Sequence, residues 1–148
     1  MQASLGMGTA PAIPGYGLDA AWSPESCALS ALIQKAIQDG IRHIDTAAGY
    51  ADAELMVGRA ADLVRRLNVR ICTKLTPQEL ESGTLACSLQ RLALDRIDTL
   101  LLTGLLHSEV NSILRDEKIG KRMAAAKQLG QISRSGASTY GTDAALCA

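Results

Sequence analysis

The stretch that decides the fold is residues 41–50, IRHIDTAAGY, in which an apolar run ends at Asp45 and a small-residue loop leads to Tyr50. A second strand pattern, residues 69–74 (VRICTK), ends in the same way at Lys74. In parallel α/β folds the carboxyl ends of successive strands converge on one face, where such folds place their chemistry. The sequence therefore predicts that the three polar side chains lie together.

A phenol beside an ammonium group is suited to general acid catalysis. The positive charge of Lys74 favours the phenolate of Tyr50 and so lowers the cost of giving up the proton. Asp45 would keep the ammonium charged and in place. Each residue also has a structural interpretation: Asp45 as a turn or cap residue, Tyr50 as a half-buried aromatic and Lys74 as a lysine whose stem packs at a strand end.

The same alternation of strands and helices continues along the chain on either side of this stretch. Strands are expected at 5–9, 41–46, 69–74, 97–102 and 132–137. Helices are expected from Ser23 to Gly40, over 52–67, from a capping box at Thr76 to Leu92, and over 108–129 with a break near Gly120. This order calls for a parallel sheet with right-handed crossovers, in one α/β domain over residues 1–148.

Three local expectations follow from periodicity. One face of the first helix should be buried, through Leu29, Leu32, Ile33, Ala36 and Ile37. Thr76 and Glu79 have capping-box spacing, with Pro77 in the first turn. His43 alternates with Ile44, and we expect it to pack against a neighbouring helix.

Several spaced motifs resemble those of the aldo-keto reductases, in the order in which that family has them. They are LGMGT (5–9), GIRHIDTAAGY (40–50) with Glu54 and Val57-Gly58, TKL (73–75), SLQRL (88–92), DRIDTL (95–100), GQI (130–132) and GAS (136–138). The resemblance covers nearly all of the chain.

This resemblance implies a TIM-type (β/α)8 barrel that uses NADP to reduce a small-molecule aldehyde or ketone. By motif position, Tyr50 would protonate the carbonyl oxygen, Lys74 would tune it and Asp45 would pair with Lys74. Thr103 stands where the family has its fourth catalytic residue, a histidine. His107 follows Thr103 and could swing toward the site, but a histidine that opens a helix is more often solvated.

The resemblance also implies cofactor contacts at Thr46, Ser138 and Thr139, the last in place of an asparagine of the family. The phosphates of the cofactor would be held mainly after the seventh and eighth strands. A complete barrel needs about 250 residues, so 148 residues should form roughly its first five strand–helix units. We therefore expect a partial barrel, truncated at its C-terminal end, with a weak or incomplete NADP site.

An open sheet of this kind leaves a free edge at each end. The first and fifth strands would present unpaired backbone groups to another chain. The chain is therefore expected to associate with itself or with a complementary half barrel.

Composition limits the function classes. Fifteen basic and 15 acidic residues give no net charge, which argues against electrostatic binding to nucleic acid. The four cysteines, Cys27, Cys72, Cys87 and Cys147, lack metal-binding spacing and are interpreted as reduced thiols, with no metal. No apolar run has membrane-spanning length and no signal-like segment is seen, so a cytoplasmic protein is expected.

Two function classes remain open. One is an oxidoreductase of the aldo-keto reductase type, weakly active as an isolated fragment or half barrel. The other is a derivative of that family without redox activity, either a binding or scaffold module or a cofactor-free acid–base catalyst. Whether this chain is an enzyme is not decided by its sequence.

Overall fold

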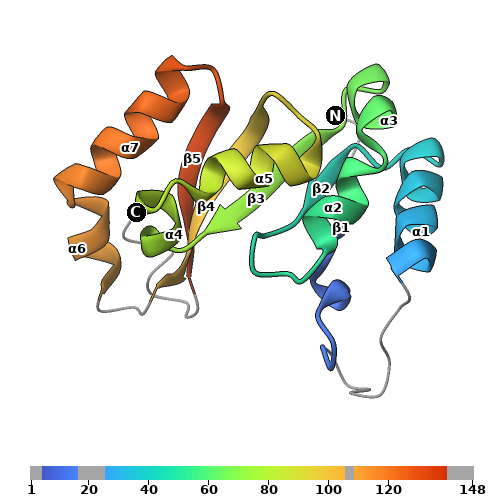
Figure 1. The fold of residues 1–148 in the computed structure, drawn as a ribbon, viewed down its shortest axis with the longest axis horizontal. Helices are drawn as coiled ribbons and strands as arrows, with labels where there is room; N and C mark the ends of the chain where they lie inside the picture. The colour runs from blue at the N-terminus through green and yellow to red at the C-terminus, as the bar shows by residue number, and fades with distance from the viewer. Residues whose placement is uncertain (1–4, 17–25, 106–108, 140–148) are drawn as a thin grey trace.

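The computed structural model describes residues 5–16, 26–105 and 109–139. Five parallel strands form one sheet in chain order (Figure 1). The strands are β1 (Gly6–Gly8), β2 (His43–Asp45), β3 (Arg70–Leu75), β4 (Ile97–Leu105) and β5 (Ile132–Thr139). All five predicted strands are present, and the fold is the predicted part of a (β/α) barrel.

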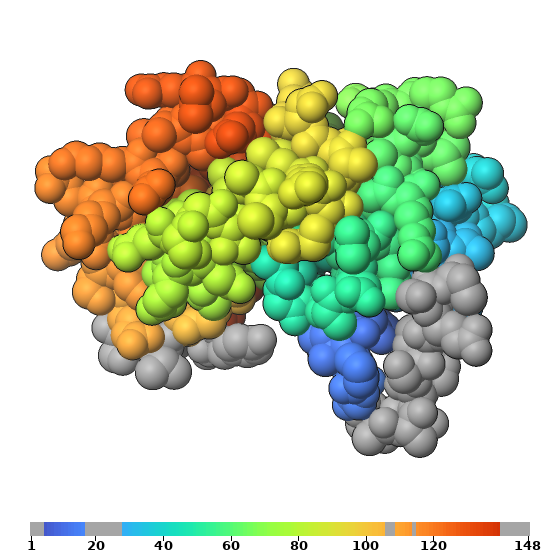
Figure 2. Space-filling model, in the orientation of Figure 1, coloured from blue at the N-terminus to red at the C-terminus, as the bar shows by residue number. Residues whose placement is uncertain are grey.

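The helices cover one face of this curved sheet. They are η1 (Ala10–Ala12), α1 (Ser26–Gln38), α2 (Ala53–Gly58), α3 (Ala61–Arg66), α4 (Pro77–Glu81), α5 (Thr84–Leu92), α6 (Val110–Leu114) and α7 (Glu117–Gln128). Figure 2 shows the helix-covered face, from α1 at one end through α2 and α5 to α7 at the other. No helix within the described ranges is long and apolar enough to cross a membrane.

The hydrophobic core lies between the sheet and these helices. The strands contribute outward-facing apolar side chains that are almost fully buried, and the helices contribute apolar residues from their inner faces. Among the most buried of these are Ile33, Ile37, Ile44, Val57, Ile71, Leu92 and Leu100. Residues that alternate with them along the strands therefore face the other, concave side of the sheet.

One row of register partners crosses that concave side from edge to edge. Gly8 pairs with Asp45, Asp45 with Cys72, Cys72 with Thr99 and Thr99 with Arg134. All five line a single hollow in the sheet. The row thus places residues from all five strands beside one another.

Three expected helices are each divided into two. Residues 52–67 form α2 and α3, and Gly58, the last residue of α2, lies so close to α5 that a Cβ there would be 2.2 Å from the carbonyl oxygen of Arg91. The helix opened by Thr76 ends before Gly83, whose φ is 84°. The segment after β4 breaks at Asp116 rather than Gly120, because the Asp116 side chain caps α7 by accepting from Lys118 N and Ile119 N.

The capping box at Thr76 is confirmed. Its hydroxyl accepts from Glu79 N, and the Glu79 carboxylate accepts from Thr76 N. The expected buried face of α1 is right for Leu29, Ile33 and Ile37 but wrong for Leu32, which is 54% exposed. At about 100° per residue Leu32 lies on the margin of the stripe defined by the other three. The cap expected at Ser23 lies outside the described residues.

Candidate active site

Lys74 and Asp45 form an ion pair at the carboxyl ends of β3 and β2. The Lys74 ammonium donates to Asp45 Oδ2 and, at 3.1 Å, to the carbonyl oxygen of Thr46. The Lys74 side chain is 10% exposed, whereas that of Asp45 is 46% exposed. The pair predicted from the strand ends is therefore present, with its carboxylate half open to solvent.

Tyr50 completes the group. Lys74 Nζ lies 5.1 Å from the centroid of the Tyr50 ring. The loop that carries the tyrosine is attached to the end of β3, because Ala48 N donates to the carbonyl oxygen of Lys74 at 3.1 Å. Tyr50 N in turn closes a turn onto the carbonyl oxygen of Ala47. Strand pairing and a short loop thus place the ammonium against both the phenol ring and the carboxylate.

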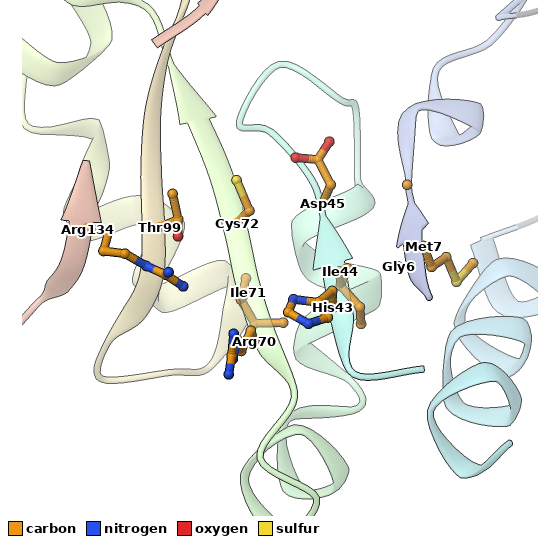
Figure 3. A pocket seen from close by; sticks show the side chains of 11 residues that line it. Gly6, Met7, His43, Ile44, Asp45, Arg70, Ile71, Cys72, Thr99 and Arg134 are labelled. Atoms are coloured by element: carbon orange, nitrogen blue, oxygen red, sulfur yellow. The ribbon is translucent and has the colours of Figure 1, made fainter. Parts of the chain in front are cut away.

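Cys72 is a member of this neighbourhood that the sequence did not single out. It is the register partner of Asp45 and lies beside it on the same face of the sheet (Figure 3). Burial, and then the negative charge of Asp45, raise the pKa of Cys72 to about 11, so the thiol is protonated at neutral pH. The available signal was alternation: Cys72 and Lys74 are two residues apart on β3 and share a face.

A second polar cluster lies behind the first, between β3 and the helices. Glu54 is 1% exposed and accepts from Thr73 Oγ1 at 2.7 Å and from Arg91 Nε at 2.7 Å. Arg91 also donates to Ser88 Oγ at 3.2 Å. In the sequence Glu54 was only part of a motif; in the structure it ties α2, α5 and β3 together next to Lys74.

The other predicted site residues differ in how far they are buried. Thr103 is half-buried on β4, two residues after Leu101, the register partner of Lys74. Ser138 and Thr139 are half-buried at the end of β5. Thr46 is fully buried, and its hydroxyl has no hydrogen-bond partner among the described residues. His107 lies outside the described residues.

His43 corrects one expectation. It lines the hollow on the concave side, while Ile44 packs into the core beneath the helices. Only one of two alternating residues can face the helices, and burial of the larger apolar surface of isoleucine decides which one does. His43 therefore belongs to the same face as Asp45 and Cys72.

No cluster able to hold a metal ion is found among residues 5–16, 26–105 and 109–139. Cys72 and Cys87 are free thiols, the former half-buried and the latter exposed on α5.

The parallel sheet, its helix-covered outer face and a tyrosine–lysine–aspartate group at the strand ends define an α/β barrel-type fold with three polar side chains brought together at one end of the sheet. The model of the aldo/keto reductase family matches residues 4–145. The chain therefore belongs to the aldo/keto reductase family.

Individual relatives agree with this family. Over 102 residues the chain is 38% identical to glycerol 2-dehydrogenase (NADP(+)) of Saccharomyces cerevisiae, a match covering 66% of the chain and 32% of the relative. An aldo-keto reductase structure from Pseudomonas aeruginosa superposes with a TM-score of 0.70 at 26% identity, covering 90% of this chain and 54% of that one. MGS-M4, an aldo-keto reductase from a Medee basin deep-sea metagenome library, gives a TM-score of 0.66 at 25% identity, with coverages of 97% and 47%.

The chain thus spans about a third of its curated relative and about half of these solved structures. The range matched by the family model, residues 4–145, includes all five strands.

Proposed function

We propose that this chain carries the acid–base machinery of an NADP-dependent oxidoreductase that reduces an aldehyde or ketone to an alcohol. The observation that supports it is the position of Lys74 Nζ, which is paired with Asp45 and lies 5.1 Å from the Tyr50 ring centroid. A lone tyrosine or lysine at a strand end would be unremarkable. An ammonium group held between a carboxylate and a phenol can stabilise the phenolate and so help the phenol to donate its proton.

In the proposed mechanism Tyr50 donates its phenolic proton to the carbonyl oxygen of the substrate. The nearby Lys74 charge stabilises the phenolate that remains after transfer. Asp45 and the Thr46 carbonyl oxygen hold the ammonium in position, so its charge is present before the reaction begins. Thr103 would offer a short neutral hydroxyl donor where the family has a histidine.

The residues present fit the nicotinamide end of the cofactor. The half-open Asp45 carboxylate can accept from ribose hydroxyls, and the half-buried Ser138 and Thr139 hydroxyls can bond an amide group. Thr46 is fully buried, so its part in binding would be to position Lys74 through its carbonyl oxygen. When bound, NADPH would supply the hydride. The name of the yeast relative supports the choice of NADP.

We expect the isolated chain to bind NADPH weakly. The charge-assisted contacts that hold phosphates most strongly come from arginine and lysine, and the only cation at the carboxyl ends of β2 and β3 is already paired with Asp45 within the described residues. Activity of this chain alone is therefore expected to be low.

The test is NADPH consumption with a panel of aldehydes and ketones, comparing Tyr50→Phe with Tyr16→Phe. Tyr16 is an exposed tyrosine outside the site, so its substitution controls for loss of a phenol as such. Loss of a general acid costs about a hundred- to ten-thousand-fold in rate, and only Tyr50→Phe should show it. Lys74→Met should act in the same direction, whereas Lys35→Met, at an exposed ion pair on α1, should not.

Equal rates for Tyr50→Phe and the wild type would rule out the proposed acid. If neither the wild type nor Thr103→His reduced any carbonyl compound, the non-redox binding or scaffold function would replace the oxidoreductase. Increased activity of Thr103→His would instead show that the site has the geometry of the family.

We also propose that the chain associates through its sheet edges with a second copy or with a complementary half barrel. β1 and β5 each have one strand neighbour among the described residues, so one side of each is left without a sheet partner. Light scattering at micromolar concentration should show a dimer or larger species. A well-folded monomer at that concentration would contradict the proposal.

A further inference from the structure

A groove of about 460 Å³ lies on the helix-covered outer face, where α4 and α7 pack side by side (Figure 1). The wall from α4 is Glu81, the last residue of that helix. The wall from α7 consists of Lys118, Lys121, Arg122 and Ala125. Because the groove lies outside the sheet, pairing of the β1 and β5 edges would leave it open.

The cations of the groove share one flank of α7. At about 100° per residue, Lys118, Lys121 and Arg122 fall within a sector of about 100° around the helix axis. The neighbouring inner face packs into the core through the buried residues Ile119, Met123 and Ala126. Lys127 is also exposed but lies on the opposite flank, so it does not belong to the groove.

The cations outnumber the carboxylates that face them. Lys118 and Arg122 have no ion pair and no side-chain hydrogen bond with any residue in the described ranges. Lys121 is paired with Glu117 at 3.2 Å on the exposed side of α7. Glu81 likewise has no ion pair in the described part of the chain. Two uncompensated cations therefore face one carboxylate across the groove.

Helix stability does not account for these two cations. Lys118 lies in the first turn of α7, where the positive end of the helix dipole disfavours a cation. Lys118 and Arg122 are four residues apart, a spacing at which like charges destabilise a helix. By contrast, Lys127 lies in the last turn, where the dipole favours it. Negative charge supplied from outside would offset the repulsion between Lys118 and Arg122.

We propose that this groove binds an acidic peptide segment of another protein, with one carboxylate of the segment on Lys118 and another on Arg122. The two cations are about 6 Å apart along the axis of α7. Alternate residues of an extended segment are about 6.6 Å apart and point to the same side. Two acidic residues at alternate positions can therefore each meet one cation, while the residues between them face Glu81 on the other wall.

A compact inorganic anion is a poorer occupant. All of its charge would lie within the groove, close to the Glu81 carboxylate, whereas an extended segment can turn its acidic side chains toward α7 alone. A nucleic acid strand is also disfavoured. The chain has no net charge, and no aromatic side chain on which a base could stack is among the residues that line the groove.

The experiment is fluorescence anisotropy of a dye-labelled, capped peptide in which glutamate alternates with serine, titrated with the whole chain at low ionic strength, where screening is weak. Lys118→Gln and Arg122→Gln should each weaken binding about threefold, as expected for the loss of one exposed charge pair. Lys127→Gln, which removes the same charge from the opposite flank of α7, is the matched control and should bind as the wild type does. Glu81→Gln should tighten binding about twofold, because it removes a like charge.

Three further probes decide between the occupants: the same peptide with glutamine in place of glutamate, pyrophosphate, and a single-stranded oligonucleotide of thymidine. The proposal is overturned if the glutamate peptide binds no more tightly than the glutamine peptide, or if pyrophosphate or the oligonucleotide binds more tightly than either. It is also overturned if Lys127→Gln weakens binding as much as Arg122→Gln, or if Glu81→Gln weakens it. The substituted side chains are all exposed, so the variants should remain folded, which circular dichroism checks.

Discussion

Thr73 and Lys74 are neighbours on β3, yet they belong to two polar clusters of opposite character. Thr73 faces the helices and donates to Glu54, which is also bound by Arg91. Lys74 contacts Asp45 and the Tyr50 ring at the carboxyl end of the strand. One step along the strand thus separates a polar cluster enclosed by helices from one that reaches the open end of the sheet.

The two carboxylates differ most in exposure. The Glu54 side chain is 1% exposed and that of Asp45 is 46% exposed, although each has a cationic partner. Glu54 is enclosed by donors from α5 and β3, so it can contact nothing further. Asp45 keeps accessible surface beside a charged lysine. We call the group of Glu54, Thr73 and Arg91 the outer cluster and the group of Asp45, Tyr50 and Lys74 the inner cluster. The difference in exposure indicates that the outer cluster holds helices and strand together, while the inner cluster is accessible to a ligand.

The strongest test of this contrast is Arg91→Met. Removing Arg91 leaves the Glu54 charge buried without its cationic partner, and breaking a buried pair in this way costs about 3–5 kcal/mol. Since the Arg91 side chain is 30% exposed, we expect a loss of about 3 kcal/mol, the lower end of this range. Urea unfolding of Arg91→Met and of the exposed control Arg66→Met measures it.

The corresponding change in the inner cluster should have a smaller effect on stability. In Lys74→Met the apolar stem is retained and the remaining Asp45 carboxylate is half solvated, so we expect a loss of about 1 kcal/mol or less. If Lys74→Met destabilised the protein as much as Arg91→Met, the division into a structural and a functional cluster would be wrong.

The strand ends of this protein are easier to predict from its sequence than its helix breaks. The strands, and the meeting of Asp45, Tyr50 and Lys74, were predictable because an apolar run that ends in a polar residue is a local signal. The helix breaks were missed or misplaced, although two of them have local causes, the positive φ of Gly83 and the side-chain cap of Asp116. No such local signal marks the break after Gly58, whose contact with the Arg91 carbonyl oxygen joins it to another helix.

The residues of the hollow were missed for a related reason. In β3 both Arg70 and Ile71 fit a strand, and only packing against helices shows that Ile71 faces the core and Arg70 the hollow. His43 was placed on the wrong face by the same ambiguity. Alternation alone gives two choices of face, and tertiary burial selects one.

The start of α7 was also misplaced. The glycine at 120 suggested a break there, but the side-chain cap of Asp116 decides where α7 begins.

The smallest predicted effect concerns Cys72, the register partner of Asp45 on β3. Its pKa is raised from 9.0 to about 11, first by burial and then by Asp45. A raised pKa in the folded state means that stability is fully present below pH 9 and is lost as the pH rises toward about 11, because the unfolded chain releases the proton first. The thiolate, which is the reactive form, is correspondingly rare in the folded protein at lower pH.

Alkylation by iodoacetamide at about pH 8, followed by peptide mapping, should therefore modify the exposed Cys87 well before Cys72. The thiolate fraction at a two-unit higher pKa is about a hundredfold smaller, and limited access slows Cys72 further. Asp45→Asn removes the negative charge but not the burial, which is the larger cause. We thus expect Asp45→Asn to increase the alkylation rate of Cys72 by much less than a hundredfold. Equal modification of Cys72 and Cys87 in the wild type would show that the thiol is not held against Asp45 in the folded chain.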